Sequence, residues 1–446
     1  MSDPAPVQDG LPVPRRYWAI VSIGLGITLA VLDGAIANVA LPTIAQDMNA
    51  SEAASIWIVN AYQIAIVVCL LPLASLGEIV GYRRVSQVGL AVFTLASLAC
   101  AFADSVLTLS LARVLQGFGA AGIMSVNGAL VRFTYPHRLL GRAVGINAVI
   151  VSLAAAAGPT IAGAVLAVGE WRWLFALNVP IGVLAVSLAG FTLPHNPLSK
   201  RPLNWTGAAL TAATFGLSIT GLQALAHGEA AALGFGLVGA GLLAGVLLVR
   251  HERPRAAPLI PLDLLARPMF SLSVATSVIS FTAQMMAFVA LPFFIQGALG
   301  LSAVETGLLM TPWPLATMVA APLAGHLSDR HSAGVLGAIG LTVFACGLMA
   351  LSQLEPDSSK LDIVWRMALC GAGFGFFQSP NNRAMLSEAP RERAGAAGGS
   401  LGTARVIGQS LGAVVVAFLL AAAPGDGVRR GFELAAVAAL FGAGMS

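Results

Sequence analysis

Charged residues are scarce in this chain of 446 residues. Only 10% of the residues are Asp, Glu, Lys or Arg and 57% are hydrophobic, whereas a soluble domain carries about 25% charged residues. The net charge is +4, and only Lys200 and Lys360 are lysines, so the chain offers no basic stripe for nucleic acid. These shortages exclude an ordinary cytosolic enzyme, a disordered chain and a nucleic-acid-binding protein.

Patterns typical of metal sites and catalysis are also missing. The four cysteines lie in apolar runs, with a spacing that fits neither a zinc site nor a disulfide framework. The six histidines form no HxxxH or HExxH pair, and no phosphate-binding GxxxxGK[ST] segment occurs. An intramembrane enzyme would need a cluster such as paired Asp residues or facing Ser and His residues, and the apolar runs contain none. We therefore expect no metal, no cofactor and no enzymatic activity.

Long apolar runs take up most of the chain. Each is long enough to cross a ~30 Å hydrocarbon core as a helix, and a helix satisfies its own backbone hydrogen bonds in lipid. Fourteen such runs are expected, at approximately 17–42, 55–76, 84–103, 106–132, 140–168, 172–193, 205–226, 230–249, 268–297, 303–327, 333–353, 363–386, 394–422 and 430–446. The polar, proline-rich N-terminus predicts a cytoplasmic tail, and not a signal peptide, because the first apolar run is long and contains Asp33.

The basic residues are distributed unevenly between the two sides of these runs. Seventeen fall on the side of the N-terminus and four, Arg172, Lys360, Arg429 and Arg430, on the other. The positive-inside rule then places both termini in the cytoplasm. The preference for Arg over Lys and the many Ala and Gly residues favour a GC-rich bacterium, and thus a multi-pass protein of a bacterial inner membrane.

An internal repeat divides the chain. Val39–Pro42 recurs as Val289–Pro292, and Pro72–Ala74 recurs as Pro322–Ala324, both at an offset of 250 residues. Two parallel six-helix halves around a central cavity are typical of transporters. We predict a cytoplasmic tail at 1–16, a six-helix bundle at 17–193, an inserted helix pair with its linkers at 194–267, and a second six-helix bundle at 268–446.

Five motifs carry a family resemblance. They are Leu32–Pro42 in the first run, Ala74–Arg84 after the second, Leu111–Ala121 in the fourth, Ala154–Gly163 in the fifth and Trp171–Gly182 at the sixth. In this order they resemble the major facilitator superfamily, specifically its fourteen-span drug:proton antiporters of the QacA/EmrB type. The resemblance implies an all-α membrane fold of fourteen helices, and antiport driven by the proton gradient without a bound cofactor.

The second motif departs from the family pattern. Glu78 stands where Asp is usual, Ile79 stands where Arg is frequent, and Ala74 replaces the first glycine. A charge relay at this turn is therefore expected to be weaker in the first half than in the second, where Asp329 and Arg330 keep the usual pair.

Asp33 is the acidic residue deep inside an apolar run, where a charge costs ~2.5–3.5 kcal/mol and is usually functional. Arg113 lies at a similar depth, ~13 Å below the predicted outer face at 1.5 Å per residue. We predict that this pair couples proton binding to transport. The alternatives are a structural ion pair or helix cap for Asp33, and hydrogen bonds to backbone carbonyls of the first span for Arg113.

Polar, aromatic and methionine side chains within the runs form a candidate substrate site. An adaptable apolar wall and aromatic faces suit amphipathic or cationic molecules, although ordinary packing is the alternative for each residue. Arg405 could instead hydrogen-bond across helices. The candidates are Trp57, Asn60, Tyr62, Gln63, Met124, Asn127, Asn147, Phe281, Gln284, Phe288, Gln378 and Arg405.

Candidate gating residues are glycines, prolines and charges at turns and close helix contacts. Small residues permit close helix approach, and ion pairs at the turns could break between two states; tight packing and plain membrane topology are the alternatives. The candidates are Gly77, Glu78, Gly81, Arg83, Arg84, Gly158, Pro159, Gly163, Asp329 and Arg330.

The resulting hypothesis is a proton-coupled efflux transporter of amphipathic drugs or lipophilic cations, in which substrate in the cavity displaces the proton on Asp33. Two alternatives stay open: an exporter of an endogenous metabolite or organic anion, and a membrane sensor without transport. The expected partners are membrane lipid, a small-molecule substrate and protons, with no nucleic acid. The sequence does not determine the oligomeric state, and a monomer is one option.

Overall fold

The computed structural model describes residues 10–136, 139–199, 202–226, 231–255, 262–328, 330–388, 394–423 and 425–446. The regular structure of these residues is helical. The first half of the chain contains α1 (Arg15–Asp47), α2 (Glu52–Ser55), α3 (Trp57–Val80), α4 (Tyr82–Ala101), α5 (Val106–Thr134), α6 (Leu140–Val168), α7 (Arg172–Ala176) and α8 (Asn178–Thr192). Then come α9 (Trp205–Ala226), α10 (Ala231–Glu252) and the short α11 (Leu262–Leu265).

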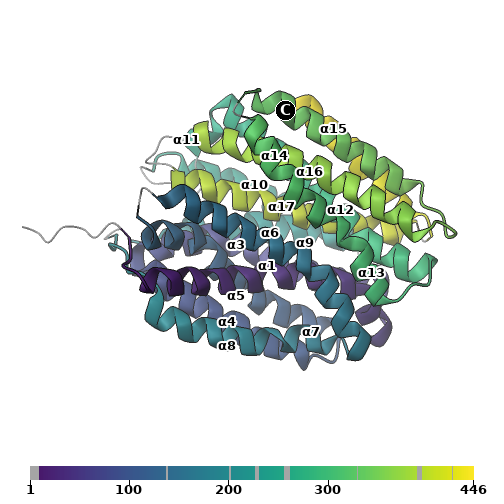
Figure 1. Cartoon of the computed structure of the whole chain (residues 1–446), viewed down its shortest axis with the longest axis horizontal. Coiled ribbons are helices and arrows are strands. Elements are labelled where there is room, and N and C mark those ends of the chain that lie inside the picture. Colours follow the sequence, from purple (N-terminus) through teal and green to yellow (C-terminus); the bar gives the residue numbers. More distant parts are fainter. Residues whose placement is uncertain are drawn as a thin grey trace, which may run out of the picture.

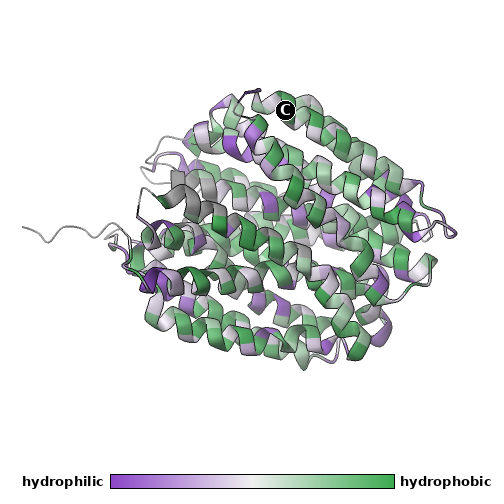
Figure 2. Cartoon of the chain, in the orientation of Figure 1, coloured by the Kyte–Doolittle hydropathy of each residue, from purple (hydrophilic) through white to green (hydrophobic). Residues whose placement is uncertain are grey.

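The second half begins at α12 (Pro268–Phe293), which continues into a π-helical turn, η2 (Phe294–Ala298). It continues with α13 (Ala303–Met310), α14 (Pro312–Leu327), α15 (Ala333–Ser352), α16 (Lys360–Glu388), α17 (Ala394–Ala422) and α18 (Gly427–Met445). Figure 1 shows the helices of the first half packed together below those of the second half, with their long axes roughly aligned. Apolar residues cover most of the visible helix lengths (Figure 2).

The predicted count of fourteen spans is wrong. Among the described residues, twelve helical segments are long and apolar enough to cross a membrane. In this count α7 and α8 form one segment, as do α12 with η2 and α13 with α14. The helices predicted at 363–386 and 430–446 exist as α16 and α18, but neither meets the requirement.

Their amino-acid composition explains why these two helices are not apolar enough to count as membrane spans. The second half of α16 is polar, with Gln378, Asn381 and Asn382 close together. In α18 the charged residues Arg429, Arg430 and Glu433 occupy the first two turns of a helix of only 19 residues. Both helices are packed in the second half of the chain: α16 contacts α14 and α15, and α18 contacts α15 and α12.

The two halves meet along two seams. One joins α6 to α13, and the other joins α3 to α17. The inserted helix α9 packs on both α3 and α17, and α10 packs on α9, so the inserted pair covers the second seam. A single apolar core includes Leu41 and Ile44 of α1 together with Leu291 and Phe293 of α12, and therefore spans both halves.

The ends of the helices define two faces of the molecule. The loops at 48–51, 102–105 and 299–302 follow α1, α4 and η2 at one face, which we refer to as the predicted outer face. The positive-inside rule assigns this face to the outside of the membrane.

Candidate functional site

A buried cluster of polar side chains surrounds Asp33 in the first half. Asp33 is only 1% exposed and forms an ion pair with Arg113 of α5. Gln116 of α5 and Asn178 at the start of α8 donate hydrogen bonds to its other carboxylate oxygen, at 2.9 and 2.8 Å. Two neighbouring helices thus converge on one carboxylate of α1, and each contributes donors that stabilise its charged form.

Arg113 is held from several directions. Its Nε donates to the carbonyl oxygen of Ile58 in α3 at 3.2 Å, and Nη1 donates to Oε1 of Gln116 at 2.6 Å. The guanidinium also lies 4.1 Å from the ring centroid of Tyr62, within the range of a cation–π contact. Both predicted bonding modes occur together, since Arg113 pairs with Asp33 and also reaches a backbone carbonyl, although that carbonyl belongs to α3 and not to α1.

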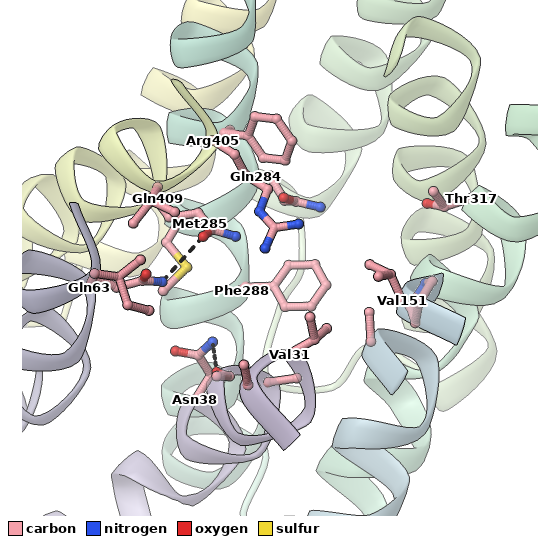
Figure 3. Close-up of a pocket in the computed structure, with 18 of the residues that line it drawn as sticks. Val31, Asn38, Gln63, Val151, Gln284, Met285, Phe288, Thr317, Arg405 and Gln409 are labelled. Atoms are coloured by element: carbon pink, nitrogen blue, oxygen red, sulfur yellow. Dashed lines mark hydrogen bonds between the residues drawn. The ribbon is translucent and has the colours of Figure 1, made fainter. Parts of the chain in front are cut away.

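A cavity lies between the halves at the middle of the helices. It is lined from the first half by α1, α3, α5 and α6, and from the second by α12, α14, α16 and α17. Figure 3 shows Arg405, Gln284 and Phe288 of the second half facing Gln63, Asn38 and Val31 of the first. Its volume is about 190 Å³, below the roughly 300–1,000 Å³ of typical ligand pockets.

Asp33 does not line this cavity. Its neighbours on α1, Ala30, Val31 and Gly34, do so, but the carboxylate points toward α5 and α8. Tyr62 lines the cavity and stacks on the guanidinium of Arg113, so its ring lies between the cavity and the ion pair. The hypothesis that substrate directly displaces a proton from Asp33 therefore lacks the required contact in this structure.

Eight of the twelve candidate substrate residues line the cavity. They are Tyr62, Gln63, Met124, Phe281, Gln284, Phe288, Gln378 and Arg405. The other four lie elsewhere: Asn60 donates to Gln223 of α9 at 2.7 Å, and Asn127 bonds to Asn147 at 3.2 Å, while Trp57 is not part of the lining. Asn60 thus links the first half to the inserted pair and does not face the cavity.

The cavity also includes residues that the sequence analysis missed. Gln409 follows Arg405 by one helical turn and accepts a hydrogen bond from Gln63 across the α3–α17 seam at 3.3 Å. Asn38, Trp313, Thr317 and Phe374 complete the polar and aromatic parts of the lining. Gln409 could have been found from Arg405, because residues four apart share one face of a helix.

The seam between α6 and α13 is tightly closed near the predicted outer face. A Cβ atom at Gly163 would lie 2.9 Å from the Cα of Val304, and one at Gly307 would overlap the carbonyl oxygen of Pro159. The hydroxyls of Thr160 and Thr311 are 2.6 Å apart across the same seam. Gly158 instead faces Ala35 of α1, inside the first half.

A second contact closes the same face between α1 and η2. Gln296 donates from Nε2 to the carbonyl oxygen of Val39 at 3.1 Å, and Thr43 donates to Oε1 of Gln296 at 3.4 Å. Gln296 lies in the π-helical turn, a local irregularity frequently associated with functional sites. Together with the α6–α13 seam, this contact separates the cavity from the predicted outer face.

The turn between α3 and α4 docks on its own half. Gly81 adopts φ = +107°, which favours glycine. Arg83 donates to the carbonyl oxygen of Gly190 and lies 3.1 Å from Nε2 of His195, and the backbone of Glu78 accepts a bond from Ser199 at 2.8 Å.

The remaining gating candidates belong to this turn and to its counterpart after α14. Gly77 packs against the ring of Tyr82 within the first half. Arg84 reaches the carbonyl oxygen of Val80 on its own half at 3.5 Å. The backbone N–H of Arg330 bonds to the last turn of α14, and Asp329 lies outside the described residues.

Two helical halves of similar build with a cavity between them are typical of membrane transporters. Residues 23–413 match the family model of the Major Facilitator Superfamily. The chain belongs to this superfamily, whose members are transporters and not enzymes. Membership of the fourteen-span subgroup is not shown, since the described part of the chain has twelve candidate spans.

Individual relatives agree with this assignment. The chain is 53% identical over 440 residues to an uncharacterized transporter, YebQ, of Escherichia coli, covering 98% of this chain and 96% of that one. It is 30% identical to the riboflavin transporter RibZ of Clostridioides difficile, over 89% of this chain and 87% of that one. It is also 30% identical to the multidrug resistance protein Stp of Mycobacterium tuberculosis, over 91% of this chain and 76% of that one. The same fold occurs in a bacterial homolog of the human lysosomal transporter Spinster, solved in an inward-facing and unoccupied conformation. The TM-score is 0.67 at 15% sequence identity, and the match covers 98% of this chain and 97% of that one.

Proposed function

We propose that this protein is a proton-coupled exporter of amphipathic small molecules in a bacterial inner membrane, with both termini in the cytoplasm. The relatives support transport of such molecules, because one is a riboflavin transporter and another a multidrug resistance protein. The cavity supports the proposal as well, since its lining combines aromatic rings with amide side chains. An amphipathic molecule can satisfy both surfaces at once.

The two closing contacts support a mechanism of alternating access. With α6 packed on α13 and Gln296 bonded to α1, the cavity is closed toward the predicted outer face. Rocking of one half against the other would break these contacts and open that face. The small cavity volume of about 190 Å³ implies that the halves also separate further when a drug-sized molecule enters.

The observation that carries proton coupling is the burial of Asp33. In the described part of the chain, Asp33 and Glu252 are the buried acidic residues, and Glu252 is the last residue of α10. Asp33 alone lies at the middle of a candidate span, where an ionisable group is usually functional. Protonation would remove the charge that holds Arg113 in place.

Coupling to substrate is then indirect. Tyr62 touches both partners, because its ring lines the cavity on one side and covers Arg113 on the other, and its hydroxyl donates to the carbonyl oxygen of Ala30 at 2.9 Å. A substrate that moves this ring changes the packing on Arg113, and loss of the Asp33 charge releases the ring in turn. Substrate and proton therefore act on each other without touching.

A transport assay tests this proposal. The protein is reconstituted in proteoliposomes, and uptake of a fluorescent dye is followed with and without an imposed pH gradient. We expect gradient-driven transport by the wild type, and by Asp33→Asn only dye equilibration that ignores the gradient. Asp47→Asn is the matched control, because Asp47 is an acidic residue of the same helix whose side chain is 49% exposed. Transport by Asp33→Asn that still responds to the gradient would refute the role of Asp33.

A further inference from the structure

Arg405 is a charged side chain of α17 without a protein partner. Within the described part of the chain it makes no ion pair or hydrogen bond, and its Nε is buried and unsatisfied. The rest of the guanidinium reaches the cavity, and Figure 3 shows it pointing inward from α17, on the same side as Gln284 and Phe288. The packing alternative, a hydrogen bond across helices, is therefore not what this arginine does.

An unpaired cation at this depth is costly. A charge in the middle of a span is unfavourable, and a buried donor without an acceptor adds the cost of its lost hydration. Arg113, the other arginine near the cavity, has a counter-charge in Asp33 and donates to Ile58 and Gln116, so that only its Nη2 lacks a partner among the described residues. Arg405 has none of these, and a molecule in the cavity can supply the acceptor.

The described wall of the cavity contains no group that would compensate Arg405. No Asp or Glu lines it, and Arg405 is the one Arg or Lys among the described lining side chains. Asp33 is committed to Arg113 and lies behind Tyr62. The cavity therefore carries a net positive charge, which repels a lipophilic cation and attracts an anion.

The walls beside Arg405 are aromatic. The ring centroids of Phe288 and Trp313 are 4.9 Å apart at 77°, and those of Phe281 and Phe374 are 5.2 Å apart at 75°. All four rings line the cavity. Phe288 is partly exposed, whereas Phe281, Trp313 and Phe374 are at most 6% exposed. Phe288 thus offers the accessible ring surface for a flat apolar body, and the other three rings support it from behind.

We propose that Arg405 anchors the acidic group of an amphipathic organic acid, whose aromatic body packs against these rings. The inference rests on the proposed export function and specifies the substrate class for that cavity. A guanidinium offers two parallel N–H groups to a carboxylate or sulfonate, a geometry that an ammonium group cannot provide. Gln284 and Gln378, which also line the cavity, present further polar groups to the same molecule.

The repeat shows that this charge belongs to one half only. Gly412 of α17 corresponds to Gly158 of α6 in the repeat, at an offset of 254 residues, so the position of Arg405 corresponds to Val151. Val151 lines the opposite wall of the same cavity. The anion-binding group thus lies in the second half and the proton-binding group in the first.

Equilibrium binding with matched probes tests the proposal. Purified full-length protein in detergent is titrated with three labelled naphthalenes of similar size: 2-naphthoate, 2-naphthalenemethanol and 2-naphthylmethylammonium. The wild type should bind the carboxylate at least roughly tenfold more tightly than the ammonium compound, as expected for a charge-assisted bond. Arg405→Gln should weaken naphthoate binding at least roughly tenfold while changing binding of the alcohol less than about twofold. Arg405→Lys should retain an intermediate preference for the carboxylate.

Arg366→Gln is the matched control, because Arg366 is a largely buried arginine of the same half that bonds to the carbonyl oxygen of Ala350, away from the cavity. It should bind all three probes as the wild type does. The proposal is overturned if the ammonium compound binds as tightly as the carboxylate, if Arg405→Gln weakens all three probes equally, or if none of the probes binds. This binding experiment uses no pH gradient and therefore does not depend on proton coupling. Proton coupling is tested separately by the transport assay of Asp33→Asn, so the two proposals can fail independently.

Discussion

Replacing Asp33 by Asn removes one charge from the buried cluster and leaves the other. The amide oxygen can still accept hydrogen bonds from Gln116 and Asn178, but the amide nitrogen then faces a donor of Arg113. Arg113 keeps its bonds to Ile58 and to Gln116 but loses its counter-charge. The converse change, Arg113→Gln, leaves a carboxylate with two amide donors and no cation.

Removing one partner of a buried ion pair typically costs about 3–5 kcal/mol, whereas replacing both partners by neutral groups is often far less costly. The retained bonds of Arg113 place Asp33→Asn near the lower end, at about 3 kcal/mol, and Arg113→Gln should cost a similar amount. The double variant, which combines Asp33→Asn with Arg113→Gln, is neutral at both positions and can re-form amide–amide hydrogen bonds. We expect it to cost about 2 kcal/mol, so the two substitutions should be coupled by roughly 4 kcal/mol.

The assay is a double-mutant cycle in which the apparent unfolding temperature of each variant is measured in detergent. All variants are heated at the same scan rate, because unfolding of large proteins is frequently irreversible and the apparent temperature then depends on that rate. Each single variant should unfold at a clearly lower temperature than the wild type. The double variant is expected to lose less stability than either single variant and should therefore unfold above both of them. The ion pair between Asp47 and Arg172 provides the control cycle. Its N–O distance is 3.3 Å and both side chains are substantially exposed. Because solvent weakens an exposed ion pair, the coupling energy of this pair should stay below about 1 kcal/mol. Additive losses at Asp33 and Arg113 would contradict the argument that the buried pair acts as a unit.

Two further predictions concern the seam and the Tyr62 ring. Gly307→Val should prevent closure of the α6–α13 seam, because its side chain would overlap the carbonyl oxygen of Pro159. Labelling of a single cysteine in the cavity from the outer face should therefore increase. Gly236→Val is the control, because Gly236 has open space around it and its substitution should leave the labelling unchanged. Tyr62→Ala should expose the carboxylate of Asp33 to a hydrophobic carbodiimide, while Tyr62→Phe keeps the ring and should leave the carboxylate protected. Unchanged cysteine labelling would count against the first prediction, and equal carbodiimide reaction in the Tyr62→Ala and Tyr62→Phe variants against the second.

The sequence predicted most of the architecture. Apolar runs placed the long helices within a few residues, and the repeat of Val39–Pro42 at Val289–Pro292 identified the two halves. The equal depth of Asp33 and Arg113 anticipated their contact. The span count failed because apolar runs were accepted by length, although the polar residues of α16 and the charges of α18 lower their suitability as spans.

The candidate site was only partly predictable, because depth along a helix says nothing about its rotation. Asn60 and Gln63 are three residues apart in α3, yet Gln63 faces the cavity and Asn60 faces Gln223 of α9. The same limitation concealed that Asp33 points away from the cavity while its neighbours on α1 line it. The position of Tyr62 between the cavity and Arg113 depends on the packing of several helices at once, and no local pattern in the sequence encodes it.

The repeat clarifies why proton and substrate need not compete for one residue. Asp33 corresponds to Ala283 at the offset of 250 residues, and Arg405 corresponds to Val151 at the offset of 254 residues that relates α6 to α17. Each half therefore lacks the charged group that the other carries. A carboxylate and an unpaired guanidinium facing the same cavity would neutralise each other and leave neither for its ligand. Burying the carboxylate behind Tyr62 against its own arginine keeps the second arginine free for an anion. We infer that this separation allows a single chain to handle both an acidic substrate and a proton. An acid introduced at the cavity wall, as in Val151→Asp, should offset the positive charge of Arg405 and weaken naphthoate binding without disturbing the Asp33–Arg113 pair.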